Sequence, residues 1–536
     1  MVNRINIFST AKLLFIALTF VSIITYGQDV QPNQQKFARL LRLIDSYYVD
    51  STNIGKLTED AIIKVLSDLD PHSVYIPEED VIKKSEGLKG NFEGIGISFN
   101  IFKDTLMVVS TIPGGPSEKV GLQAGDRIVT VDNKNIAGIG LKNSDVFKML
   151  KGKKGTLVEL EVKRRNNPEL LDFRIIRDKI PIHSLDASYM LDETTGYIRL
   201  NKFSATTAEE FNTAITELKK KSLENLILDL RNNGGGFLRA AIKIADQFLD
   251  AGQMIVYTNG LKQPKRDYFS SPRGNFKKGK LVVLVNEGSA SASEIVSGAI
   301  QDWDRGLIIG RRSFGKGLVQ QPFFLPDGSM VRLTTAHYYT PCGRCIQKPF
   351  ENGLKNYRED YMKRVEHGEM FNQDSINFDE SQKFLTLKNK RVVYGGGGIM
   401  PDIFVPMDTS SYYRYFNKLR RNNIINTFTT EYVDKNRESL TKKFSNFKKF
   451  KNKFEVTGEM INELVAMGEK EGVEKDEESM GHTTMFIKKE VKALIARNLY
   501  TRSEFFQILN IDDDCISKAL EVINKQGEYD RLLAGG

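Results

Sequence analysis

The feature that most constrains the fold is an apolar strand that ends in a glycine turn and continues into a helix. Leu281–Gly288 is an apolar stretch of strand length ending in glycine, and Ser293–Trp303 carries apolar residues at helical spacing. Gly306–Gly310 is a second short apolar stretch soon after this helix. Similar short strands alternate with helical patterns from residue 180 to about residue 407. This alternation predicts an α/β core.

A serine and a lysine near this turn form a candidate catalytic pair. Ser291 lies among small residues in the sequence VNEGSASASE, and Lys316 follows 25 residues later between two glycines. A serine hydroxyl needs a base, and a lysine can act as one near neutral pH only if burial lowers its pKa. We therefore interpret Ser291 as a nucleophile and Lys316 as its base. A helix-capping serine and a solvated lysine are the alternatives.

A second strand-to-helix turn carries three consecutive glycines. Leu226–Leu230 is a short apolar strand, residues 232–236 form the turn NNGGG, and residues 237–249 have helical spacing. A glycine run lets backbone N–H groups point into a site, so we predict an oxyanion hole made by the amide of Ala292 and the amide of one of Gly234–Gly236, of which we choose Gly235. A phosphate-binding loop is excluded, because no Lys-Ser/Thr pair follows the glycines. A purely structural tight turn remains an alternative.

Strands and glycine-rich turns alternate in Asn91–Arg165, where the string KVGLQAGDRIVTVD follows a glycine-containing strand. This segment resembles a PDZ domain. The resemblance implies a loop whose backbone N–H groups hold a peptide's C-terminal carboxylate while the peptide pairs with a strand edge. Without this resemblance, the same residues would be interpreted only as a glycine-containing strand. The residues assigned to this substrate-binding loop are Phe92, Gly94, Ile95, Gly96 and Ile97.

Between about Leu69 and Pro406 the chain carries, in order, LDPHSVY, FEGIGI, LQAGDRIVTVD, LILDLRNNGGG, VNEGSASASEI, SFGKG, LPDGSMVRLTTAHYYTP and GIMPDI. Through these motifs it resembles the carboxyl-terminal processing peptidases, PDZ-containing Ser/Lys endopeptidases of bacterial envelopes and chloroplasts. The resemblance implies that Ser291 is the nucleophile, Lys316 the general base and Gln320 the group that orients the lysine. It also implies an α/β multidomain fold, with a PDZ domain inserted ahead of a crotonase- or ClpP-like α/β peptidase core and helical N-terminal and C-terminal regions.

The sequence therefore predicts a serine endopeptidase that processes or degrades exported proteins from or near their C-termini through an acyl-enzyme. The expected partners are protein or peptide substrates with free C-termini, and no cofactor is expected. The alternative from another class is a catalytically silent PDZ scaffold of the cell envelope. A crotonase-like acyl-CoA enzyme is disfavoured by the PDZ-like segment and by the N-terminal segment described below.

Composition excludes nucleic-acid binding. The 536 residues include 77 Lys and Arg against 68 Asp and Glu, a net charge of +9, and the basic residues are dispersed among nearly as many acids. No basic stripe interleaved with aromatic residues is present. The mild positive charge is compatible with a position at the periphery of an anionic membrane, although a generally solvated surface explains it equally.

The cysteines do not predict a metal site. The chain has three, and two of them stand in the CxxC sequence of Cys342 and Cys345, where small residues such as serine are usual in the family that the chain resembles. A lone CxxC supplies only two ligands, and the five histidines show no HExxH or paired spacing. Two small half-buried side chains are the favoured interpretation, with a disulfide or thiol exchange as alternatives.

The N-terminus predicts export. Arg4 and Lys12 precede Leu13–Ile24, an apolar run of the length found in signal peptides, and a small residue precedes Gln28 at the expected cleavage point. We expect an exported, periplasmic protein. Because Tyr26 makes the cleavage site imperfect, an uncleaved N-terminal segment that holds the protein at the membrane is the alternative.

These observations divide the chain into five parts. Two segments depart from a minimal family member: a charged insertion at residues 348–391, and a C-terminal extension with helical spacing. We interpret the extension either as a packing cap or as a module for homo-oligomer or adaptor contacts. The predicted parts are a signal peptide (1–27), an N-terminal helical region (28–88), a PDZ domain (89–170), the peptidase core (171–408) and the C-terminal helical extension (409–536).

Overall fold

The computed structural model describes residues 30–165, 167–350, 353–407 and 414–535. The chain divides into two compact units, Met1–Leu69 and Asp70–Gly536. In the first unit the described residues form two helices, α2 (Val30–Tyr47) and α3 (Ile54–Leu69). The predicted signal peptide, residues 1–27, lies outside the described residues.

The second unit contains an antiparallel sheet, that of the predicted PDZ domain, around a small apolar core. Its strand order is β3-β4-β5-β7-β8, with β6 paired to β5, so that β3 is an edge strand. Strand β8 begins at the predicted domain boundary and pairs along its whole length with β7, so it belongs to this sheet and not to the peptidase core. The strands are β3 (Ile97–Phe102), β4 (Thr105–Thr111), β5 (Arg127–Val131), β6 (Lys134–Asn135), β7 (Leu157–Lys163) and β8 (Leu170–Ile176).

Two short helices and one strand pair complete this domain. Helix α6 (Asn143–Leu150) carries Val146 and Leu150 into the core of the PDZ sheet, and α5 (Pro116–Lys119) follows β4. Helix α4 (Glu78–Lys89) leads into β2 (Asn91–Gly94), which pairs antiparallel with β9 (Asp178–Pro181). The chain thus enters and leaves the domain through one pair of neighbouring strands.

The peptidase core is a six-stranded sheet in the order β10-β11-β12-β15-β16-β21. β10 is antiparallel to β11 and the other strands are parallel, which requires crossover helices. The confirmed α/β fold follows from the strand-to-helix turns of the sequence. The strands are β10 (Leu185–Met190), β11 (Thr195–Leu200), β12 (Asn225–Asp229), β15 (Leu281–Val285), β16 (Leu307–Gly310) and β21 (Ile403–Phe404).

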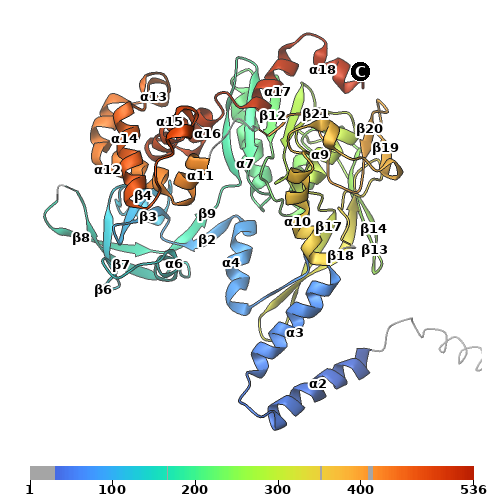
Figure 1. Cartoon of the computed structure of the whole chain (residues 1–536), viewed down its shortest axis with the longest axis horizontal. Coiled ribbons are helices and arrows are strands. Elements are labelled where there is room, and N and C mark those ends of the chain that lie inside the picture. The colour runs from blue at the N-terminus through green and yellow to red at the C-terminus, as the bar shows by residue number, and fades with distance from the viewer. Residues whose placement is uncertain (1–29, 166, 351–352, 408–413, 536) are drawn as a thin grey trace, which may run out of the picture. The chain divides into compact units, whose positions relative to one another are not determined.

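Both faces of this sheet are buried, which explains why its strands are apolar without alternation. Leu228 and Val283 face α7 (Thr207–Lys219), α8 (Leu238–Ala245) and α9 (Ala292–Asp302). Ile227 and Val282 face the opposite way, against side chains of the two C-terminal helices, α17 (Asp514–Asn524) and α18 (Glu528–Leu533). Figure 1 shows these last helices beside the core strands.

A second, five-stranded sheet lies in the same unit and carries part of the candidate site. β18 is at its centre and pairs with β1, β13 and β17, while β14 pairs with β13. Because β17 and β1 both pair with β18, residues far apart in sequence come together here. The strands are β1 (Val74–Ile76), β13 (Met254–Gly260), β14 (Gln263–Phe269), β17 (Leu318–Phe324) and β18 (Met330–Tyr339).

The described residues of the charged insertion, 348–350 and 353–391, contain helical and strand elements. These are α10 (Gly353–Glu366), two 3₁₀ turns, η1 (Gln373–Ser375) and η2 (Glu380–Gln382), and β19 (Lys383–Leu385), which pairs with β20 (Val392–Tyr394). One ion pair joins the insertion to the core: Glu369 contacts Arg312, and its carboxylate also contacts Arg364 of the insertion itself.

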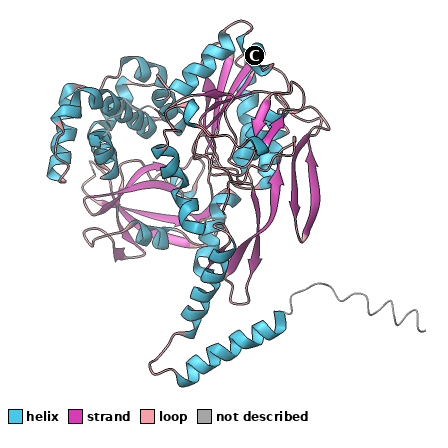
Figure 2. Cartoon of the chain, turned by 45° about the vertical axis from the view of Figure 1, so that its right-hand side comes forward, coloured by secondary structure: helices cyan, strands magenta, loops and turns pink. Residues whose placement is uncertain are grey.

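The C-terminal extension has two different structural roles. Its first six helices form a bundle whose apolar core is distinct from that of the PDZ sheet, and Figure 2 shows the chain's helices in cyan and its strands in magenta. Helices α17 and α18 instead cover one face of the peptidase sheet, where the Tyr529 hydroxyl donates to the carbonyl of Leu281 at 2.9 Å. The bundle helices are α11 (Arg414–Arg421), α12 (Ile424–Lys443), α13 (Phe447–Lys453), α14 (Gly458–Lys470), α15 (Glu477–Leu499) and α16 (Arg502–Leu509).

Candidate active site

Ser291 occupies the turn between β15 and α9, at the carboxyl end of the parallel strands. It immediately precedes the first residue of the helix and has φ 55° and ψ −111°, a conformation that L-residues other than glycine rarely adopt. Such strain persists only where the surroundings hold it in place. A Cβ atom added to Gly235 would lie 2.9 Å from Ser291 Cβ, so the glycine turn packs directly against the serine.

Lys316 lies in the loop between β16 and β17, and Gln320 on β17 holds its ammonium group. Lys316 Nζ donates to Gln320 Oε1 at 3.0 Å. The Gln320 amide nitrogen donates to the backbone carbonyl of His72, which fixes the amide so that its oxygen faces the lysine. Burial lowers the pKa of Lys316 below its usual value, and the charge of Arg332 adds to this effect.

Two buried side chains join the backbones of these residues, and the sequence analysis identified neither. The Tyr338 hydroxyl reaches the carbonyl oxygens of Ser291 at 3.1 Å and Lys316 at 2.6 Å. The Glu294 carboxylate accepts from the amides of Ser291 at 2.7 Å and Lys316 at 2.9 Å. Within the described part of the chain, no hydrogen bond joins the Ser291 hydroxyl to Lys316 Nζ, so the pair is held together through these two side chains.

Glu294 is fully buried, with donors on both of its oxygens. The Ser313 hydroxyl and the Gly315 amide complete the set at 2.5 and 2.7 Å. Burial raises the pKa of Glu294 to about 7, although these hydrogen bonds oppose the shift. One signal in the sequence could have indicated this residue, because a glutamate three positions after a helix-capping serine is the pattern of a capping box.

The two predicted oxyanion-hole residues lie close together, but only one of their backbone amides is free of a hydrogen bond within the described residues. Ala292 is the first residue of α9, and among the described residues no acceptor lies on its amide, which leaves it available as a donor. Gly235 also packs against Ser291, yet its amide donates to Asn233 Oδ1 at 2.9 Å. The role of Gly235 as second donor stays a prediction that requires this bond to open.

The predicted carboxylate-binding loop is shorter than the sequence analysis assigned. Phe92 and Gly94 lie in β2, paired with β9, and Ile97 is the first residue of β3. Only Ile95 and Gly96 form the connection between these strands. Gly96 has φ 80°, and a Cβ atom there would lie 2.9 Å from Ile180 Cδ1, so this position requires glycine.

The CxxC cysteines lie outside this arrangement and are free thiols, each partly exposed. Burial raises the pKa of Cys342 to about 11, and the nearby Asp302 adds to the shift. A raised pKa leaves little thiolate at neutral pH, which disfavours thiol exchange. Among the residues that the structure describes, no group of three or more His, Cys, Asp or Glu side chains could hold a metal ion.

Comparisons with known proteins follow the same division of the chain. Residues 194–355 match Peptidase family S41, residues 107–164 match PDZ domain, and residues 415–501 match a family of unknown function (DUF8443). The last match covers most of the C-terminal helical bundle.

The matches with two relatives span most of the length of each relative. The chain is 37% identical over 350 residues to the carboxy-terminal-processing protease of Bartonella bacilliformis, covering 62% of this chain and 80% of that protein. It is 33% identical over 407 residues to the carboxy-terminal processing protease CtpB of Bacillus subtilis, covering 74% and 83%. Among solved structures, the photosystem II D1 C-terminal processing protease is 32% identical, covers 59% of this chain and 90% of that chain, and has a TM-score of 0.34.

Burial of Lys316 leads to a prediction about stability. A lysine whose pKa is lower in the folded than in the unfolded protein costs stability at neutral pH, and this cost disappears as the pH rises past the usual lysine value. We expect Lys316→Met to raise the free energy of unfolding at about pH 7 and to lose that advantage at about pH 11, above the usual lysine pKa. Urea unfolding at both pH values measures the difference.

The exposed Lys219 on α7 supplies the matched control. Lys219→Met should leave the free energy of unfolding within about 0.5 kcal/mol of the unmodified protein at both pH values. A Lys316→Met protein that is less stable at neutral pH, or whose advantage does not depend on pH, contradicts the prediction.

Proposed function

The chain belongs to the carboxy-terminal processing proteases, serine peptidases of family S41, and we propose that Ser291 and Lys316 form its catalytic dyad. The single observation that carries the proposal is the partly buried Lys316 amine, which Gln320 orients and whose pKa is lowered. A binding-only PDZ scaffold has no need for a lysine at this position, because burying its charge lowers stability. The scaffold alternative is therefore not favoured.

The dyad would act in two steps. In the first, the neutral Lys316 amine takes the proton of the Ser291 hydroxyl as Oγ attacks the scissile carbonyl, and the amide of Ala292 stabilises the oxyanion. The resulting lysine ammonium then gives its proton to the leaving amine, which departs and leaves an ester on Ser291. In the second step the same amine activates water, which releases the acid and restores the serine.

We predict that Ser291→Ala and Lys316→Ala each lower kcat/KM for peptide cleavage by ~10⁴ or more, because the two residues act as one unit. The double variant should be no slower than either single variant. Activity of the unmodified enzyme should rise across mildly alkaline pH as Lys316 loses its proton, and Lys316→Arg should be inactive because guanidinium stays charged.

Gln320→Ala is the graded control, since it removes the group that orients the lysine and leaves both reacting groups in place. Its activity should lie between those of the unmodified enzyme and Lys316→Ala. An active Lys316→Arg enzyme, or a double variant much slower than both singles, would rule out the dyad.

We further propose that the PDZ domain captures the C-terminus of the substrate. Among the described residues β3 pairs only with β4, which makes it an edge strand, and the connection of Ile95 and Gly96 leads directly into it. An extended peptide can add to such an edge while backbone N–H groups at its start hold the terminal carboxylate. The names of the Bartonella and Bacillus relatives likewise describe processing at the carboxy terminus.

This proposal predicts that peptides with a free apolar C-terminus are cleaved faster than the same peptides carrying a C-terminal amide, because amidation removes the charge that the loop recognises. Gly96→Val should abolish the difference. Gly138→Val is the matched control, because Gly138 has a similar φ of 74° in the same domain but no atom within 4 Å of an added Cβ. Equal cleavage of both peptides by the unmodified enzyme would retain the peptidase and remove carboxylate recognition.

Export to the periplasm is also proposed, on sequence grounds alone. No described helix is both long and apolar enough to cross a membrane, and the supporting residues, Arg4, Lys12 and Leu13–Ile24, precede the described part. N-terminal sequencing of the protein from its native cells should find a mature end near Gln28. An intact Met1 in the membrane fraction would instead support an uncleaved anchor. Self-association or adaptor binding through residues 409–536 remains part of the same proposal.

A further inference from the structure

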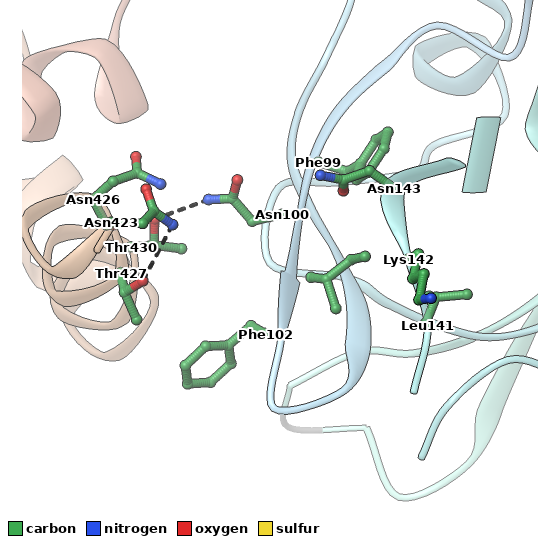
Figure 3. A pocket seen from close by; sticks show the side chains of 11 residues that line it. Phe99, Asn100, Phe102, Leu141, Lys142, Asn143, Asn423, Asn426, Thr427 and Thr430 are labelled. Carbon is green, nitrogen blue, oxygen red and sulfur yellow. Dashed lines mark hydrogen bonds between the residues drawn. The ribbon is translucent and has the colours of Figure 1, made fainter. Parts of the chain in front are cut away.

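A cavity of about 390 Å³ lies between the PDZ domain and the helical bundle (Figure 3). One wall is formed by β3 and by the residues where α6 begins, and the other by the start of α12. The dyad is elsewhere in the fold and shares none of these residues. The side chains that matter for the argument are Asn100, Phe102, Lys142, Asn423, Asn426 and Thr427.

The free edge of β3 opens into this cavity. Ile97, Phe99 and Ile101 pack against the core of the PDZ domain, so Asn100 and Phe102 face the other side of the sheet. The hydrogen-bonding edge between these two faces has no strand partner within the described chain. A peptide that adds to this edge would place alternate side chains on opposite faces, one set toward the PDZ core and α6, the other toward Asn100 and α12.

Polar contacts hold α12 at this position. Asn100 Nδ2 donates to Thr430 Oγ1 at 3.1 Å, and Arg127 on β5 pairs with Asp434 at 2.8 Å. Both contacts are only partly buried, so each adds little stability. They fix the orientation of the helix across the outer face of β3, which leaves the space beside the strand edge open.

We infer that α12 completes the substrate groove of the PDZ domain and selects polar side chains a few residues upstream of the substrate's C-terminus. The inference rests on the proposed capture of the C-terminus by the PDZ domain. A peptide that ends at Gly96 runs antiparallel to β3, from its own C-terminus toward Phe102. At about 3.3 Å per residue, peptide residues about two to five positions upstream pass alongside Phe99–Phe102 and the cavity.

The chemistry of the α12 wall defines what it selects. The side-chain oxygen Oδ1 of Asn426 accepts from Arg497 Nη2 at 3.0 Å, which leaves the side-chain nitrogen Nδ2 of Asn426 for the cavity. Figure 3 shows Asn423, just before α12, and Asn426 and Thr427 on the helix, across the cavity from Asn100 and Phe102. Lys142 is the single charged residue among the described residues that line the cavity. Serine, asparagine or aspartate side chains in the substrate therefore fit this wall, and lysine or arginine do not.

The test uses the full-length Ser291→Ala protein, which binds peptides without cleaving them. Fluorescence anisotropy would give Kd for peptides with one fixed apolar C-terminus and with Asp, Ser or Lys at the fourth position from the end. We expect the aspartate and serine peptides to bind about tenfold more tightly than the lysine peptide, the effect of about 1.4 kcal/mol. Asn426→Leu and Thr427→Val should each bring this ratio toward one without changing the preference for a free carboxylate.

Asn422→Leu is the matched control, because Asn422 is exposed, precedes α12 and does not line the cavity. It should keep the tenfold ratio. If Asn426→Leu lowers the melting temperature, Thr427→Val alone decides the result. An unchanged ratio in the folded variants, or equal binding of the three peptides by the Ser291→Ala protein itself, overturns the role of α12. Equal binding of free and amidated peptides by the Ser291→Ala protein would instead overturn C-terminal capture by the PDZ domain.

Discussion

The arrangement of the active site depends on one buried carboxylate. Glu294 accepts hydrogen bonds from the backbone amides of Ser291 and Lys316, so the turn that carries the proposed nucleophile and the loop that carries the proposed base are joined at the same carboxylate. A fully buried carboxylate is costly unless it is hydrogen-bonded, and two further donors satisfy it. The unusual backbone conformation of Ser291 is thus held by a residue of its own helix. Loss of Glu294 would remove the hydrogen bonds that hold both segments of the proposed dyad.

A second buried network ties the glycine turn to the C-terminus of the chain. Arg231, next to that turn, pairs with Asp229 at 2.8 Å and with Asp513 at 2.9 Å, just before α17. Burial alone would raise the pKa of Asp229, but the charges of Arg231 and Arg199 hold it well below its usual range. Helix α17 therefore does more than cover apolar strands, because it supplies a carboxylate that fixes the arginine beside the proposed oxyanion hole.

Local sequence patterns predicted the parts of the site that are local in structure. Ser291, Lys316 and Gln320 stand in motifs whose strands, turns and helices can be assigned within a short window, and the family that these motifs indicated is confirmed. Tyr338 and His72 could not be found in this way, because each reaches the site through strand pairing with distant segments. The sequence also could not show which helices of the C-terminal extension form the bundle and which cover the peptidase sheet. The spacing of apolar residues is the same whether a helix packs in a bundle or on a sheet.

Helix α12 of the bundle lies beside the edge strand β3 of the PDZ domain, where we propose that a substrate peptide binds. An unpaired edge strand can join any other strand, and proteins commonly restrict such edges. Helix α12 does not pair with β3, and its asparagine and threonine side chains face the cavity beside the strand instead of filling it. A wall of small polar groups leaves space for one extended peptide but offers no apolar surface for a second sheet. The same helix can therefore limit unwanted strand pairing and contribute to substrate choice, and this explains why an accessory bundle packs against the PDZ domain through polar contacts.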